Sequence, residues 1–304
     1  AVSRIHADLT AGEGLNLTQA QALAENANAS FKGPEKTGAF DIPGPCARQW
    51  LQLPNPNGRP NSDVLLPWCN GSDVTSRTSD TWIIDFGVST PLTDASLYER
   101  PFEHVQTLVK PERLKNNDRG RRENWWRFGR NGADMRVATQ HLARLIITPR
   151  VAKHRLFVWL SQPVSPDSRL FVIARADDTT FGILSSRVHE LWSLAQASIH
   201  GDGSDGGRPT YNAKSCFETF PFPAGLTPAD TAHQRTEALE GGALIPADLP
   251  DTLLAENFKQ NQPPAPVHQA QAAINTIAPR PAAMAIAQAA QRLNTLRQAW
   301  LNPP

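Results

Sequence analysis

The sequence predicts an α+β protein in which a mixed, β-rich part with interleaved helices is followed by a small helical part. Three observations predict this fold class. Gly and Pro separate short apolar runs over residues 31–87, apolar residues recur at helical spacing further along, and the composition changes to Ala, Gln, Pro and Leu after Pro223. With 304 residues, 40% of them hydrophobic, the chain can bury a sizeable core.

The first third of the chain is expected to contain mostly short strands. Residues 1–30 are rich in Ala, Asn and Gln and predict a linker with a marginal helix. The apolar runs within 31–87 indicate short strands joined by turns. Thr93 or Asp94 can then cap a helix in which Pro101 marks a kink or a restart. The apolar residues of this helix recur at helical spacing and are Leu97, Tyr98, Phe102, Val105 and Leu108.

The middle of the chain predicts a helix and then two strands. The helix is expected over about residues 134–145. The strands are expected over 156–160 and 170–174, with a turn between them at 162–167.

Two further helices are expected. A long polar loop over residues 196–215 follows the first, and a Pro-rich linker over 260–267 precedes the second. Ser185 or Ser186 can cap the first helix, whose apolar face would hold Val188, Leu191, Trp192 and Ala195. The second helix, about Ala282 to Leu301, carries a stripe typical of a helix that packs on a neighbour. Its members are Ile286, Ala289, Ala290, Leu293, Leu296 and Trp300.

The net charge of +1 conceals a strongly basic stretch between residues 110 and 130. Its basic residues are Lys110, Arg113, Lys115, Arg119, Arg121, Arg122, Arg127 and Arg130. Cations that neutralise phosphates, together with Trp125 and Trp126 packed on sugar or base, would suit a nucleic-acid surface. A solvated, charged helix with two core tryptophans explains the same pattern, so both interpretations stay open.

Two other segments carry side chains that can contact DNA. Arg150, Lys153, His154 and Arg155 can bind phosphates, and Arg can also bond guanine through two hydrogen bonds. Taken alone, this cluster is more often an ordinary surface loop. The loop over 196–215 offers side-chain types that distinguish base edges, although a mobile solvent loop has the same composition. These residues are Gln196, Asp202, Asp205, Arg208, Asn212 and Lys214.

No common catalytic motif is present in the sequence. The GxSxG, HExxH, Walker-type and GxGxxG patterns are all missing. Asp177, Asp178, His189 and Glu190 can in principle bind a metal, but capping of helices is the better explanation for the aspartates. We therefore expect no catalytic residue and no metal site in this chain.

The three cysteines are far apart and form no CxxC pair, which fits neither a disulfide framework nor a zinc site. A reducing, cytoplasmic setting is expected. No apolar run reaches the roughly 20 residues of a membrane-spanning helix and no signal-peptide core is present, so no membrane partner is expected. The chain starts at Ala1 rather than Met, which suggests a fragment or a processed chain.

Several motifs occur in one order along the chain. They are NSDVLLPWCNGSDVTSR (61–77), TWIIDFG (81–87), VKPER (109–113), NWWRFGR (124–130), TPRVAKHRLFVWL (148–160), DDTTFGILSSRVHELWSL (177–194), FETFPFP (217–223) and LRQAWLNPP (296–304). From about Phe31 onward, the chain resembles the C-terminal part of MmeI-like type IIG restriction-modification enzymes. In that family, a nuclease and an S-adenosylmethionine-dependent adenine methyltransferase precede a target-recognition domain and a small helical C-terminal domain.

The resemblance implies that residues 31–223 form the DNA target-recognition domain and 224–304 the helical domain. It also implies that the cluster at 150–155 and the loop at 196–214 face double-stranded DNA. The loop departs from the family's shorter turn through its Gly-rich stretch at 200–208. Residues 110–127 would contact phosphates or pack against the catalytic domain.

The motifs of methyl transfer are missing from the chain. It has neither a Gly-containing cofactor loop nor an Asn-Pro-Pro-Tyr-like motif for a flipped adenine, and Asn302-Pro303-Pro304 lacks the aromatic residue. We therefore expect no cofactor and no catalysis in this chain alone, with S-adenosylmethionine bound by a methyltransferase domain in cis or in trans. Two alternatives stay open: a protein-interaction module that docks onto a separately encoded methyltransferase, and an independent metal-dependent enzyme.

Overall fold

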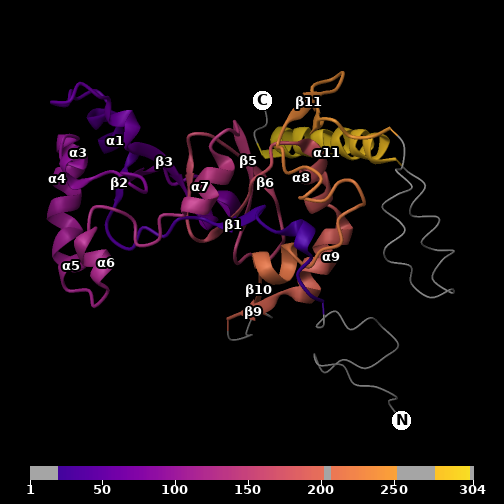
Figure 1. Cartoon of the computed structure of the whole chain (residues 1–304), viewed down its shortest axis with the longest axis horizontal. Helices are drawn as coiled ribbons and strands as arrows, with labels where there is room; N and C mark the ends of the chain where they lie inside the picture. Colours follow the sequence, from indigo (N-terminus) through magenta and orange to yellow (C-terminus); the bar gives the residue numbers. More distant parts are fainter. Residues whose placement is uncertain (1–19, 202–206, 252–277, 302–304) are drawn as a thin grey trace, which may run out of the picture. The chain divides into compact units, whose positions relative to one another are not determined.

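The computed structural model describes residues 20–201, 207–251 and 278–301, and its contacts divide the chain into two compact units (Figure 1). Unit 1 contains Arg175–Ser198 and the chain from Tyr211 onward, together with the residues up to Ala29. Unit 2 contains Ser30–Ala174 and Ile199–Thr210. Both helices and small sheets are present, so the predicted α+β class is confirmed.

An antiparallel sheet of unit 2 has the strand order β1-β8-β5-β6. Its strands are β1 (Ser30–Lys32), β8 (Leu170–Ile173), β5 (Arg144–Pro149) and β6 (Val158–Ser161). All four residues of β8 are buried, as are five of the six in β5. The two predicted strands are therefore confirmed, within a residue or two at their ends.

The helix expected over residues 134–145 is wrong in its second half. Helix α7 (Ala133–Thr139) ends early, and β5 begins at Arg144 as an inner strand of the sheet. A strand buried on both faces has a continuous apolar run instead of alternation, so its period cannot be distinguished from that of a buried helix. The run Leu145-Ile146-Ile147 has this ambiguity.

A second sheet of unit 2 has the order β2-β4-β3-β7, in which β3 and β7 are parallel and the other pairs antiparallel. Its strands are β2 (Asp41–Pro43), β4 (Thr81–Ile84), β3 (Leu65–Cys69) and β7 (Ser165–Pro166). The short helices between them are α1 (Gly44–Trp50), η3 (Asn61–Asp63) and α2 (Gly71–Thr75). The expected short strands of 31–87 are thus present, but the segment is not β-rich, because its three short helices contain as many residues as its strands.

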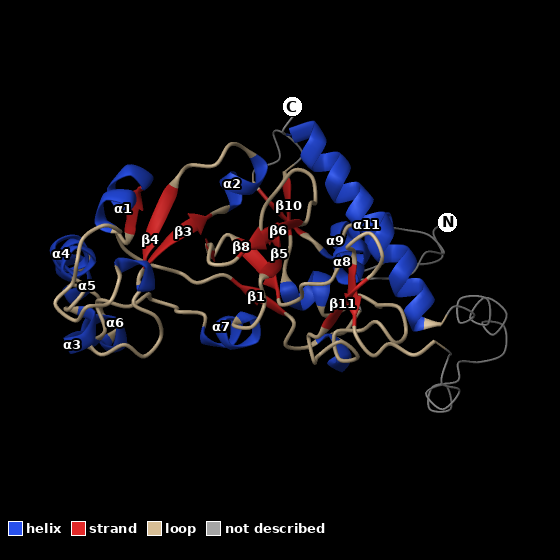
Figure 2. Ribbon diagram, turned by 90° about the horizontal axis from the view of Figure 1, so that it is seen from above, coloured by secondary structure: helices blue, strands red, loops and turns tan. Residues whose placement is uncertain are grey.

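Four helices lie together beside β3 and β4 (Figure 2). They are α3 (Leu92–Ala95), α4 (Glu99–Leu108), α5 (Lys110–Leu114) and α6 (Arg119–Glu123). The predicted restart is observed, because α4 begins at Glu99 and accommodates Pro101 in its first turn, where a missing N–H costs no helical hydrogen bond. Phe40, Ile83, Val105 and Trp126 belong to the hydrophobic core of this part.

The expected polar loop at 196–215 contains regular structure. Strands β9 (Ser198–His200) and β10 (Arg208–Thr210) pair with each other, and a bridge joins Val151 to Thr210. Asp202, Asp205 and the expected linker at 260–267 lie outside the described residues.

Unit 1 is organised around two helices, α8 (Asp178–Leu184) and α11 (Pro279–Leu301), which run side by side in Figure 1. Gly182 allows the close approach, because a Cβ there would lie 2.6 Å from Cγ2 of Ile286. The remaining elements are η2 (Ala24–Asn26), α9 (Arg187–Gln196), η4 (Ala213–Phe217), β11 (Thr236–Ala238) and β12 (Leu244–Pro246).

Two predicted caps of unit 1 are confirmed, but of two predicted apolar faces one is wrong and the other is only partly right. Asp177 and Ser186 accept backbone N–H groups at the N-termini of α8 and α9. On α9, Val188 is 68% exposed whereas His189 is fully buried. Helix α11 packs on a neighbour as predicted, and Ile286 and Ala290 of the predicted stripe lie against α8, whereas Leu293, Leu296 and Trp300 are exposed. Its buried residues are Pro279, Ala283, Ala287 and Ala290.

The two units do not coincide with the expected ranges 31–223 and 224–304, because α8 and α9 belong with α11 to unit 1. Those ranges assign functions and stay a prediction. Among the described residues, no helix is long and apolar enough to cross a membrane.

Candidate nucleic-acid interface

The tryptophans of the basic stretch belong to the core of unit 2. Trp125 and Trp126 are 6% and 7% exposed, and Nε1 of Trp126 donates to the Thr90 carbonyl at 3.0 Å. Nζ of Lys110 lies 5.0 Å from the ring centroid of Trp125. The interpretation in which these rings pack on sugar or base is therefore wrong, and the alternative of two core tryptophans is correct.

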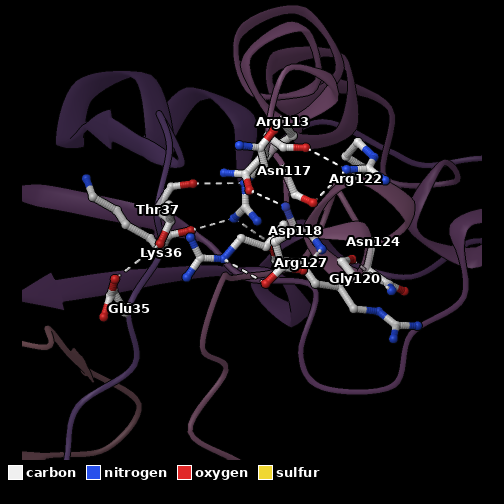
Figure 3. A network of polar contacts seen from close by, with 12 residues as sticks. Glu35, Lys36, Thr37, Arg113, Asn117, Asp118, Gly120, Arg122, Asn124 and Arg127 are labelled. Atoms are coloured by element: carbon white, nitrogen blue, oxygen red, sulfur yellow. Dashed lines mark hydrogen bonds and ion pairs between the residues drawn. The ribbon is translucent and has the colours of Figure 1, made fainter.

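Arg113 is the centre of the polar network in Figure 3 and is 3% exposed. Its guanidinium donates to the carbonyl oxygens of Thr37, Lys36 and Arg127 at 2.9, 2.8 and 3.1 Å. Burial lowers the pKa of Arg113, since desolvation penalises the charged form. Arg113 therefore holds two backbone segments together, and its buried side chain is not available to DNA.

Two other arginines of the stretch also donate hydrogen bonds to the backbone, but part of each side chain stays exposed to solvent. Arg122 donates to the carbonyls of Asn116 and Asn117 at 2.7 and 2.9 Å. Arg127 donates to the Thr90 carbonyl, and its guanidinium lies 5.0 Å from the ring centroid of Trp126.

The outermost cations of the stretch form pairs with acids one turn away. Lys115 pairs with Glu112 at 2.8 Å, and Arg119 pairs with Glu123 at 2.6 Å. Arg121 lies 4.0 Å from Asp118. Exposed pairs of this kind contribute little stability, about 0–1 kcal/mol, so these cations can exchange their partner for a phosphate at small cost.

The cluster at 150–155 lies between β5 and β6 of unit 2. Arg150, Lys153 and His154 are exposed, and their side chains have no partner among the described residues. Arg155 is half-buried and differs from the other three. It donates to Oγ1 of Thr148 at 2.9 Å and to the carbonyls of Pro149 and, at 3.3 Å, Pro209.

Arg155 thereby connects β10 to the segment that carries Arg150. The bridge between Val151 and Thr210 makes the same connection through the backbone. Arg208, the first residue of β10, is exposed. The structure therefore brings together two segments that are distant in sequence and that both carry exposed cations.

The other predicted contacts of the loop belong to unit 1. Gln196 is the last residue of α9, and Asn212 caps η4 by accepting the Lys214 N–H at 2.9 Å. Nζ of Lys214 pairs with Oε2 of Glu218 at 2.9 Å. These three residues are not in the unit that contains Arg150 and Arg208.

Sequence reasoning did not single out Arg169, an exposed cation beside the cluster at 150–155. It follows a tight turn in which Oδ1 of Asp167 accepts its N–H at 2.7 Å, and it immediately precedes β8. The Arg150 N–H donates to the Arg169 carbonyl at 2.7 Å, so the two arginines are neighbours just beyond the paired ends of β5 and β8. No local pattern indicates this pairing, because it depends on strand register.

The four residues considered for a metal site serve separate structural roles. Asp177 caps α8 as expected, and Oδ2 of Asp178 accepts the Leu244 N–H at 2.8 Å. His189 contacts the Leu184 carbonyl and the Tyr211 hydroxyl at 3.0 and 3.2 Å. Glu190 pairs with Arg187 on the same helix. The described residues contain no group of three or more potential metal ligands.

Cys69 is not an activated nucleophile. Burial, with Asp73 and Asp167 nearby, raises the pKa of its thiol to about 12. The thiol is therefore protonated at neutral pH, which is the unreactive form.

Two acids that line a pocket of unit 2 already have partners. This pocket, of about 810 Å³, lies in unit 2. Asp85 there pairs with Arg136 at 2.6 Å, and Asp63 accepts the Tyr98 hydroxyl at 3.0 Å. This arrangement indicates a structural role for them.

Comparison with known proteins adds one finding about the fold. No protein-family model matches the sequence, and no curated protein matches it. A solved structure of the type IIL restriction-modification enzyme MmeI in complex with DNA is similar, with a TM-score of 0.54 and 16% identity over 73% of this chain. The present chain spans 28% of that enzyme chain. At this identity, the likeness shows that the described protein shares a fold with part of a restriction-modification enzyme.

Proposed function

We propose that this chain is the DNA-recognition part of a restriction-modification enzyme and binds double-stranded DNA in a sequence-dependent way. One observation carries the proposal: in unit 2, a backbone bridge joins two distant segments that both bear exposed cations. The similarity of the fold to part of an enzyme solved with DNA supports it. Methyl transfer and cleavage would be performed by domains outside these 304 residues.

The proposed interface has a main and a subsidiary part. Arg150, Lys153, His154 and Arg208 form the main part, because their exposed side chains have no acidic partner to displace. The subsidiary part consists of the partly or fully exposed cations of the basic stretch, which would add contacts to phosphates. These residues are Lys110, Lys115, Arg119, Arg121, Arg122 and Arg127.

The finer assignment belongs to the same proposal. The parent enzyme would be an adenine-specific, S-adenosylmethionine-dependent methyltransferase of the MmeI-like type IIG group. Support comes from the ordered motifs between residues 61 and 304 and from the similarity in fold.

Binding to duplex DNA at several salt concentrations tests the function. If four phosphates are neutralised, raising the salt from about 50 to about 200 mM should weaken binding about 100-fold, because each contact releases condensed counterions. Fluorescence anisotropy with a labelled duplex measures this loss. Selection from a random duplex pool should then enrich one consensus sequence. A folded protein that binds no duplex at low salt contradicts the proposal.

A protein-interaction module that docks onto a separately encoded methyltransferase is the second candidate. It is favoured by the exposed apolar end of α11, where Leu296 and Trp300 are 61% and 81% exposed. Replacing Trp300 with Gln would then abolish co-purification with a methyltransferase chain and leave DNA binding unchanged.

A further inference from the structure

Arg150 and Arg169 lie just beyond the paired ends of β5 and β8, where Arg169 belongs to a tight turn. The register of β5 and β8 pairs Thr148 with Phe171 and Pro149 with Leu170, and the two arginines are the residues next to this last pair. A hydrogen bond from the Arg150 N–H to the Arg169 carbonyl, 2.7 Å long, joins them.

Two residues joined by a backbone hydrogen bond are close neighbours, so their two long arginine side chains can reach one common anion. Both arginines are exposed, and neither side chain has a partner among the described residues. The nearby Asp167 is buried, and its Oδ1 already accepts the Arg169 N–H.

This arrangement is unfavourable in the free protein, because two like charges held close together repel. A bound anion between the two guanidinium groups converts the repulsion into attraction. Such an anion must be small, negatively charged and rich in acceptors, because each guanidinium presents a planar set of N–H donors.

We propose that Arg150 and Arg169 together bind one phosphate of the DNA backbone. This inference rests on the proposed function and specifies part of its chemistry. A phosphodiester carries one negative charge and two non-bridging oxygens, so each guanidinium can donate to both oxygens or to one. A guanine edge would satisfy one arginine but would carry no charge to offset the second. Phosphate is therefore the better match for the pair.

The dependence of DNA binding on salt distinguishes a shared phosphate from two separate ones. We would compare R150Q, R169Q and the double variant with the full chain, using R100Q as a control that also removes one exposed charge. Each single variant should lose affinity about 5- to 10-fold at low salt. The double variant should lower the slope of log K against log salt by about 0.9, the value for one phosphate. A decrease of about 1.8 would mean two phosphates and would overturn the proposal.

A stability measurement tests the repulsion independently of DNA. In R150E, the new carboxylate would lie next to Arg169 and form an attractive pair with it. The melting temperature should therefore rise by about 1–3 °C at low salt and return towards the parent value at high salt. The same variant should bind DNA more weakly than R150Q. A melting temperature below that of R150Q at low salt would show that the two side chains do not face each other.

The outcomes separate this inference from the function on which it rests. If the parent chain binds DNA and the arginine variants keep its affinity and salt slope, the shared phosphate is wrong and DNA recognition stands. If the folded parent chain binds no duplex, both proposals fail.

Discussion

At the scale of single residues, burial separates cations that the sequence presents as equivalent. Arg113 and Arg119 belong to the same basic stretch, yet Arg113 is 3% exposed whereas the side chain of Arg119 is 81% exposed. A buried guanidinium needs acceptors, and Arg113 finds three of them in backbone carbonyls. Arg113 therefore has a structural role, whereas the side chain of Arg119 is accessible to solvent and to ligands.

Replacing Arg113 with Met should destabilise unit 2 and have no separate effect on DNA binding. The substitution keeps most of the side-chain volume but leaves three carbonyls without a donor, which we expect to cost about 3 kcal/mol of unfolding free energy. Urea unfolding measures this cost. R119M is the matched control and should unfold within about 0.5 kcal/mol of the parent. An R113M protein with parental stability and lost DNA affinity would instead place Arg113 at the interface.

At the scale of elements, small residues allow α8 and α11 to pack closely. A Cβ on Gly182 would lie 2.6 Å from Cγ2 of Ile286 and 3.1 Å from the backbone oxygen of the same residue. Oγ1 of Thr179 donates to the Ala283 carbonyl at 3.1 Å across the same contact. The helices therefore have no room for a larger side chain where they cross.

Replacing Gly182 with Val should lower the free energy of unfolding by about 2–3 kcal/mol, because overpacking forces the backbones apart. Thermal unfolding followed by circular dichroism measures the change. A289V is the matched control, since Ala289 is exposed on the partner helix α11 and the added methyl groups meet solvent. Equal stability of G182V and A289V would disprove the close crossing.

At the scale of the whole molecule, the chain crosses between its two units at residues 29/30, 174/175, 198/199 and 210/211. Unit 1 depends on α11, which packs on α8 and on β12. Unit 2 has its own core, in which Ile146, Ile147 and Val172 are buried.

Ending the chain before Pro279 should therefore affect the units unequally. We expect the amides of α8 to lose protection from hydrogen exchange, because their covering helix is gone, while those of β5 keep it. Hydrogen–deuterium exchange with mass spectrometry reports both regions in one experiment. W300Q is the control, since Trp300 is 81% exposed and its loss should leave α8 protected. Equal loss of protection in α8 and β5 would show that the units unfold as one.

The sequence by itself determined the features that depend on neighbouring residues. The α+β class, the caps Asp177 and Ser186, the strand before Ala174 and the helix ending near Leu301 were all predicted. Caps, turns and apolar periods depend on residues that are close together in the sequence, so they can be predicted from the sequence alone.

Only the tertiary structure decided which side chains are buried and which distant residues meet. His189 is buried on α9 because the Leu184 carbonyl and the Tyr211 hydroxyl satisfy its ring, although Val188 is the more apolar residue. Arg150 meets Arg169 through the register of β5 and β8. Such outcomes depend on partners supplied by remote segments, and a one-residue shift in register would change every neighbour on the ladder.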